Sequence, residues 1–331
     1  MKFIKWLGIV LLLLIMVYFL GPQASSPKYD MTLIEAPPYS PALEKYVSDH
    51  EALHKIKPGN EAKIIWANDS LKEKTEYAIV YLHGFSASHE EGNPVHIDFA
   101  KKFGCNLYLS RLEDHGIDTV EPMYYATADR LWNSAKLAYS IGRELGKQVI
   151  LMATSTGATL ALKLAAEYPG IAGLILLSPN IAINDPNAWL LNNHWGLQIA
   201  NLIQGKYVHA KDTSALYAKY WYPQYRMESA VQLEELLESS MKQSTFQKVK
   251  QPTLLLYYYK DDKHQDEVVK VSAMKRMFNQ LATPEDSKRS VAVPEAGDHV
   301  IGCYIRSKDV KTVEQECEKF GIEILKLAPR S

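Results

Sequence analysis

The chain has 331 residues, of which 47% are hydrophobic and 23% charged, a composition typical of a globular protein with a large buried core. Its formal net charge is −1, which gives no electrostatic reason to expect nucleic acid as a partner. The three cysteines, Cys105, Cys303 and Cys317, form no CxxC pair and no cluster with histidine, so the sequence predicts neither a disulfide framework nor a metal site.

Residues 1–21 have the pattern of a targeting segment. Lys2 and Lys5 precede an apolar run at 6–20, which is slightly short for a membrane span of about 20 residues and long for the core of a signal peptide. Pro27 should hinder cleavage of the processing-like sequence before it. We therefore predict an uncleaved signal anchor, with its lysines on the cytoplasmic side and the rest of the protein exported. A cleaved signal peptide and a buried helix of a cytosolic protein are the alternatives.

Residues 22–60 are predicted to be a proline-broken linker that leads into a short helix starting at Ser40-Pro41. From residue 61 onward, short β-rich apolar runs alternate with segments of helical period. The expected strands are 63–67, 76–82, 105–112, 148–154, 171–178, 253–259 and 290–293, and the expected helices are 94–103, 127–145, 156–168, 267–281 and 310–320. This alternation is typical of a parallel sheet with helices on both faces.

The strand expected at 148–154 runs directly into Ser155, and a helical pattern starts at Thr156. The string Ala153-Thr154-Ser155-Thr156-Gly157 is the G-x-S-x-G pattern with alanine in place of the first glycine. Such a turn puts the serine on a strained strand-to-helix corner above the helix N-terminus, where its hydroxyl can act as a nucleophile. The alternative is a serine that only caps the helix.

Another strand, 76–82, ends in His83-Gly84-Phe85. We predict that the backbone N–H groups of Phe85 and Thr156 bind a developing oxyanion, whereas His83 stabilises the turn and is not a base. A simple glycine turn without a catalytic role is the alternative.

An acidic loop follows the strand expected at 253–259, and a glycine-containing loop follows the last strand. Asp266, which opens a D-x-V-V string, is predicted to orient an imidazole, with Asp262 as the alternative acid. His299, in the loop after the last strand, is predicted to be the general base.

The order Ser155, Asp266, His299, with His83-Gly84-Phe85 upstream, resembles the α/β-hydrolase superfamily. The string Arg111-Leu112-Glu113-Asp114-His115-Gly116 makes the chain similar to the carboxylesterase, monoglyceride-lipase and serine-aminopeptidase-like group. The resemblance covers about residues 77–319. It implies an α/β-hydrolase fold with a core at 61–180 and 251–331 and a helical cap at 181–250, preceded here by the N-terminal membrane segment.

Aromatic and apolar residues concentrate in the expected cap. At least half of them must pack the cap onto the core, and the others are predicted to line an apolar slot for an acyl chain. The residues proposed for that slot are Trp195, Leu197, Leu202 and Tyr217.

The resemblance implies a serine hydrolase that cleaves carboxylic esters through an acyl-enzyme. Its partner would be a small ester or lipid-like substrate, together with a membrane at the N-terminal segment, and no metal or organic cofactor is implied. A serine peptidase or amidase, an acyltransferase, and a catalytically silent binding module are the alternatives, because a fold by itself does not choose a substrate.

Overall fold

A seven-stranded sheet forms the centre of the computed structural model, which describes residues 2–38 and 41–330. The strand order within these residues is β1-β3-β2-β4-β5-β8-β11. The strands are β1 (Lys63–Ile65), β2 (Thr75–Leu82), β3 (Asn106–Leu109), β4 (Gly146–Thr154), β5 (Ile171–Leu177), β8 (Thr253–Tyr257) and β11 (Lys288–Ala292). Only the β1–β3 pair is antiparallel, so the prediction of a mostly parallel sheet is confirmed.

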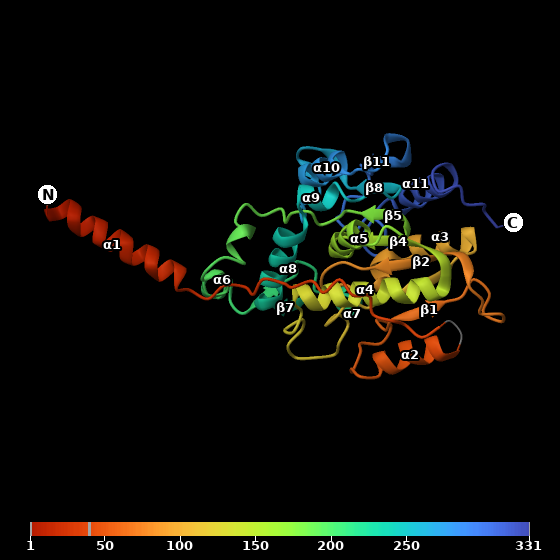
Figure 1. Ribbon diagram of the computed structural model, residues 1–331, viewed down its shortest axis with the longest axis horizontal. Coiled ribbons are helices and arrows are strands. Elements are labelled where there is room, and N and C mark those ends of the chain that lie inside the picture. The colour runs from red at the N-terminus through yellow and green to blue at the C-terminus, as the bar shows by residue number, and fades with distance from the viewer. Residues whose placement is uncertain (1, 39–40, 331) are drawn as a thin grey trace.

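Helices cover both faces of the sheet, because successive side chains of a buried strand point to opposite faces (Figure 1). Ile79 and Tyr81 of β2 join one apolar cluster, whereas Ala78, Val80 and Leu82 join another. The first cluster contains side chains of α3 (Val95–Phe103) and α11 (Val310–Glu323). The second contains side chains of α4 (Ala128–Leu145), α5 (Thr156–Glu167) and α10 (Val271–Gln280).

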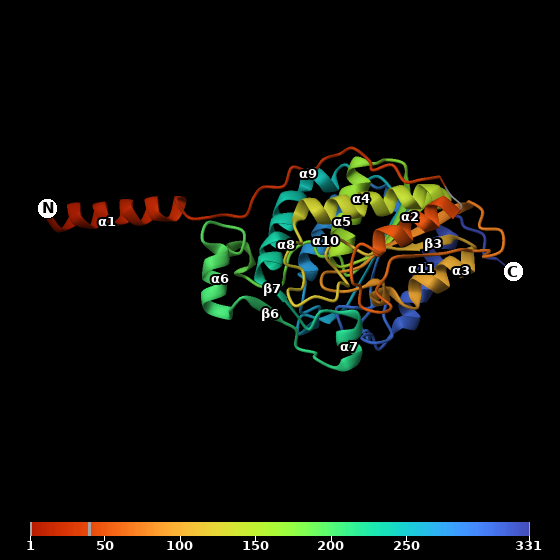
Figure 2. The same ribbon diagram turned by 90° about the horizontal axis from the view of Figure 1, so that it is seen from below.

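The segment between β5 and β8, expected as a helical cap, contains helices and also a small sheet. Its elements are η2 (Ala188–Leu190), α6 (Gly196–Gln204), β6 (Tyr207–His209), α7 (Ala215–Tyr220), β7 (Gln224–Arg226), α8 (Met227–Ser240) and α9 (Gln243–Phe246). Strands β6 and β7 pair antiparallel. Figure 2 shows α6, β6 and β7 at the end of the molecule nearest the N-terminus. Leu236 of α8 and Phe246 of α9 belong to the buried cluster of α4 and α5, so these two helices are part of the core layer.

The N-terminal helix α1 (Lys2–Phe19) extends away from the rest of the molecule, with exposed apolar side chains (Figure 1). Within the described residues, no helix has both the length and the apolar character needed to cross a membrane. The structure therefore gives no support to the expected membrane-crossing segment. Where α1 ends, Trp195 donates its backbone N–H to the carbonyl of Pro22 (2.8 Å) and its indole N–H to that of Val17 (3.0 Å).

Residues 28–33, which we call the strap, lie within the segment expected as a linker but are bound along α4. The Asp129 carboxylate accepts the backbone N–H groups of Lys28 and Tyr29, and the Tyr29 nitrogen lies 2.7 Å from Oδ1 of Asp129. Lys136 donates its ammonium to the carbonyls of Asp30 (2.6 Å) and Thr32 (2.8 Å). The strap is therefore a fixed part of the fold. Helix α2 (Pro41–Glu51) follows it, and the expected cap residue Ser40 lies outside the described residues.

We expect Lys136→Met to loosen the strap. Lys136 is 1% exposed, and methionine preserves its apolar length but removes the ammonium from both carbonyls. The Thr32 carbonyl loses its donor, whereas the Asp30 carbonyl retains the indole N–H of Trp132 (2.8 Å). The loss should lower the free energy of unfolding by about 1–3 kcal/mol and make the strap cleavable by protease. Denaturant titration and limited proteolysis with mass spectrometry measure both effects. Lys45→Met is the matched control, because that exposed ammonium binds Asp49 of its own helix and contacts no part of the strap.

Candidate active site

Ser155 stands at the corner where β4 turns into α5. Its backbone φ is 52°, in the left-handed region, where a residue with a side chain is strained by roughly 1–3 kcal/mol. The corner is tight because α5 begins against β2: a Cβ atom at Gly157 would lie 2.0 Å from the carbonyl oxygen of Leu82. This geometry turns the serine side chain out of the strand at the helix N-terminus, as a nucleophile requires.

His299 and Asp266 form a buried pair at the same edge of the sheet. Nδ1 of His299 lies 2.6 Å from Oδ2 of Asp266, and the residue Asp266 is 1% exposed. An ionised carboxylate can only accept, so Nδ1 carries a proton and Nε2 is free to take another. Burial by itself lowers the pKa of His299, but the charge and hydrogen bond of Asp266 outweigh it and raise that pKa, with further contributions from Glu91 and Asp298.

The structure pairs His299 with Asp266 and leaves Asp262 away from it. After β8, the hairpin of β9 (Tyr259–Asp261) and β10 (His264–Gln265) carries Asp262 outward, where its carboxylate accepts the hydroxyl of Tyr259. The hairpin then returns Asp266 to the strand end, where its N–H binds the carbonyl of Tyr258 (3.2 Å).

The D-x-V-V string has a geometric role in this arrangement. Oδ1 of Asp266 accepts the backbone N–H groups of Val268 (2.9 Å) and Val269 (3.0 Å), so the carboxylate is held by two donors besides His299. Residues 268–270 instead pair with residues 182–184: Asn184 donates its N–H to the Val268 carbonyl (2.9 Å), and Lys270 donates its N–H to the Ala182 carbonyl (2.9 Å). Helix α10 therefore begins at Val271, and the expected start at residue 267 was wrong.

The loop after β2 passes directly beside Ser155. A Cβ atom at Gly84 would lie 3.1 Å from Cβ of Ser155, so a side chain at this position would crowd the corner. The backbone N–H groups of Phe85 and Thr156 have no hydrogen-bond acceptor within residues 2–38 and 41–330. Two free N–H groups next to a serine hydroxyl are suited to binding an oxyanion.

His83 holds this loop in place. Its Nε2 accepts the N–H of Leu112 (3.0 Å), which leaves the proton on Nδ1, and Nδ1 binds the carbonyl of Gly84 (2.9 Å). Burial, followed by the nearby His115, lowers the pKa of His83 well below its usual value. The residue is therefore a neutral support of the turn, because both ring nitrogens are already occupied.

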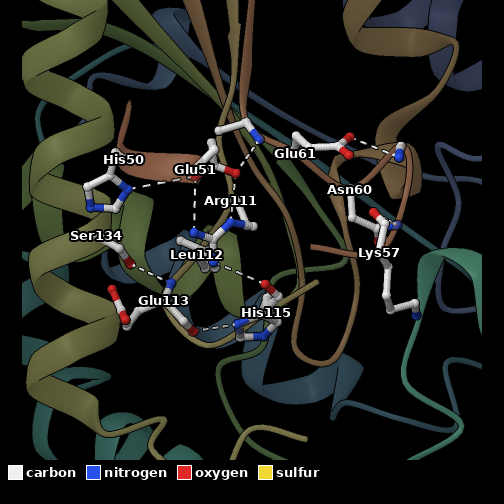
Figure 3. Close-up of polar contacts among 12 residues, drawn as sticks. His50, Glu51, Lys57, Asn60, Glu61, Arg111, Leu112, Glu113, His115 and Ser134 are labelled. Carbon is white, nitrogen blue, oxygen red and sulfur yellow. Dashed lines mark hydrogen bonds and ion pairs between the residues drawn. The ribbon is translucent and has the colours of Figure 1, made fainter. Parts of the chain in front are cut away.

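Arg111 connects this support to the N-terminal part of the chain (Figure 3). Its guanidinium binds both carboxylate oxygens of Glu51 at the end of α2 (2.8 and 3.0 Å), and both side chains are at most 10% exposed. Arg111 also donates to the carbonyl of His115 (3.2 Å), and Glu51 accepts the N–H of Ala62 (2.8 Å). The segment Arg111–Gly116 thus has a structural role, because it supports His83 and the loop after β2 that contains it.

The four residues expected to line an acyl slot lie in different places. Trp195 packs against the end of α1, and Leu202 is 87% exposed, so neither lines a slot. Leu197 faces a cavity of about 390 Å³ between the cap and residues 22–25. Only Tyr217 is near the catalytic groups: its ring stacks on Trp221 at 5.2 Å, and its hydroxyl is close enough to Glu91 and Asp298 for their charges to raise its pKa. Burial is the larger cause and brings that pKa to about 12.

Sequence reasoning missed Glu91, a buried carboxylate at the centre of the site. It lies in η1 (His89–Gly92), is 2% exposed, and accepts the N–H of Gly84. Nothing in its surroundings along the chain sets it apart from the neighbouring Glu90. Within the described residues, no group of three or more His, Cys, Asp or Glu side chains is arranged to hold a metal ion.

Comparison with known proteins agrees with this architecture. Residues 73–296 match the family described as serine aminopeptidase, S33. No curated protein matches the sequence.

Several solved structures share the fold. One, reported for the metagenome-derived lipolytic enzymes LipS and LipT, has a TM-score of 0.65 at 17% identity and covers 80% of this chain and 98% of its own. The monoacylglycerol lipase of Paleococcus ferrophilus has a TM-score of 0.58 at 15% identity, covering 81% and 98%. A soluble variant of the monoglyceride lipase of Saccharomyces cerevisiae has a TM-score of 0.56 at 11% identity, covering 78% and 91%. At these identities the likeness establishes the α/β-hydrolase fold.

We expect Glu51→Ala to destabilise the protein strongly. It leaves the Arg111 guanidinium, whose side chain is 3% exposed, without its carboxylate, and breaking one buried ion pair in this way typically costs about 3–5 kcal/mol. Denaturant unfolding of the two proteins gives the difference directly. Glu76→Ala is the control, since its partner Lys147 is 69% exposed and the pair lies in solvent. Equal denaturant midpoints for Glu51→Ala and Glu76→Ala would contradict this stabilising role of the Glu51–Arg111 ion pair.

Proposed function

The chain belongs to the serine aminopeptidase S33 family and is a hydrolase of the α/β-hydrolase fold, and from this premise we propose that it cleaves carboxylic esters at Ser155. The observation that carries the proposal is the buried bond between His299 and Asp266, at the same sheet edge as the strained Ser155 corner. The combination is that of a nucleophile, a base and an acid that orients the base.

In the proposed reaction, Oγ of Ser155 attacks the substrate carbonyl while Nε2 of His299 takes the hydroxyl proton. Asp266 keeps the other proton on Nδ1 and stabilises the imidazolium, and the N–H groups of Phe85 and Thr156 bind the oxyanion. His299 then gives its proton to the leaving alcohol. Water attacks the acyl-enzyme by the same steps and releases the acid.

Aromatic rings beside the oxyanion loop support an apolar acyl group as substrate. Phe85 packs edge-on against Tyr225 at 5.4 Å, and Tyr217 stacks on Trp221. The rings of Tyr217, Trp221 and Tyr225 come from the cap, and they replace Trp195, Leu197 and Leu202 as candidates for contact with an acyl chain. Cleavage of an aminoacyl amide is the second candidate, because the matching family is described as serine aminopeptidase and the same three residues cleave amides.

We expect Ser155→Ala to abolish turnover and leave the fold intact. Removing the nucleophile of such a unit lowers kcat by several orders of magnitude, on the order of a millionfold in a well-studied case. Purified protein should react with a fluorophosphonate at Ser155, and p-nitrophenyl esters should be hydrolysed faster than aminoacyl arylamides. A variant that retains a tenth of the activity contradicts the assignment of Ser155. Faster cleavage of the amides selects the peptidase.

We further propose that the protein is exported and that residues 1–21 direct it. The support is the pair of lysines before an apolar segment, together with the large apolar side chains that α1 leaves exposed. Fractionation of native cells should find the protein outside the cytoplasm, either full-length with the membrane or shortened to begin near Lys28. A cut before Lys28 leaves the strap complete. Full-length protein in the cytosolic fraction contradicts the proposal.

A further inference from the structure

Glu91 and Ser155 both border the space beside the Cα atom of Gly84. The position of a Cβ atom on Gly84 is 2.8 Å from both carboxylate oxygens of Glu91 and 3.1 Å from Cβ of Ser155. Oε2 of Glu91 also accepts the Gly84 N–H, one residue before the proposed oxyanion donor Phe85. The carboxylate is therefore fixed to the loop that faces the nucleophile.

The loop that carries His299 binds the residues on either side of Glu91 in the chain, Glu90 and Asn93. Cys303 donates its thiol to the carbonyl of Glu90 (3.2 Å), and Tyr304 binds Asn93 through its N–H (3.1 Å) and Glu90 through its hydroxyl (3.0 Å). Helix η1 is thus clamped between the loop after β2 and the loop after β11. Its buried carboxylate is close enough to His299 for each charge to alter the pKa of the other.

Protonated His299 is the cation with the largest effect on the pKa of Glu91. The other titratable or polar side chains that interact with it are Asp298 and Cys303 of the His299 loop, Tyr217 and Trp221 of the cap, and Tyr81 of β2. Asp298 is already paired with Arg306 (2.8 Å), which also binds Asp212. Burial raises the pKa of Glu91 to about 7, against the lowering effects of the Gly84 N–H, His299 and Trp221.

We propose that Glu91 is a positioning residue of the catalytic centre, which holds the oxyanion loop through Gly84 and acts as a second carboxylate that stabilises the His299 imidazolium. The inference rests on the proposed function. When His299 takes the proton of Ser155, it becomes a cation between the hydrogen-bonded Asp266 and the through-space charge of Glu91. In a buried site such a charge is only weakly screened.

A pH profile separates this role from mere loop support. The negative charge of Glu91 raises the pKa of His299, and only neutral His299 can accept the serine proton. Removing the charge therefore lowers the pKa of His299 and moves the acid limb of kcat/KM to lower pH. Loss of loop support alone would lower the rate without moving that limb.

Glu91→Gln is the decisive variant, because its amide oxygen still accepts the Gly84 N–H while the charge is gone. We expect kcat/KM on the pH plateau to fall on the order of tenfold and the acid limb to move by about one pH unit toward acid, which is the effect of one pKa unit of coupling. Glu91→Asp retains the charge and should keep the limb in place. Glu90→Gln is the matched control, since Glu90 binds Asn93 and Tyr304 and not Gly84; its limb should not move.

The acid limb is compared between the unaltered protein and the variant. If full activity needs neutral His299 and ionised Glu91, the acid limb of the unaltered protein reports two coupled ionisations, whereas that of Glu91→Gln reports only the ionisation of His299. An acid limb that stays in place in Glu91→Gln overturns the inference. Absence of both fluorophosphonate labelling and ester hydrolysis in the unaltered protein would instead refute the proposed function.

Discussion

Helix α5 packs so closely against strand β2 at Gly157 that a methyl group there would overlap the Leu82 carbonyl. This close approach forces the chain to turn within one residue, and Ser155 takes the left-handed backbone conformation that the turn requires. The same contact brings the loop after β2 against the serine, so the proposed oxyanion donors and the nucleophile are arranged together. The local strain is offset by the surrounding buried sheet, in which β2, β4 and β5 are paired along their length.

The charged groups of the site depend on burial and on specific partners. The Asp266 carboxylate is held by two backbone N–H groups and by His299. Glu91 has fewer donors, and burial therefore raises its pKa toward neutrality. The two carboxylates face one imidazole from different loops. A histidine between two carboxylates is stabilised in its protonated form, and this is the form that a general base takes when it has accepted a proton.

The periphery supports this centre through contacts between distant parts of the chain. Glu51, at the end of α2, binds Arg111 and thereby stabilises the segment whose Leu112 N–H orients His83. The strap binds α4 through main-chain carbonyls and N–H groups, which any sequence possesses. Trp195, Leu197 and Leu202, which resemble a ligand-lining set by composition, instead contact the end of α1, face another cavity or lie in solvent.

The sequence by itself determined the alternation of strands and helices, because local periodicity records which face of each element is buried. It also placed Ser155 at a strand-to-helix corner and His299 after the last strand, since small residues and glycines mark those turns. Only the tertiary structure decided which acid binds His299. The short β9–β10 hairpin carries Asp262 outward and returns Asp266 to the strand end, and the sequence does not show this direction. It alone revealed Glu91 and the strap, because Glu91 binds a backbone N–H and the strap binds through its own backbone to residues remote in sequence, and backbone groups leave no pattern in the side chains.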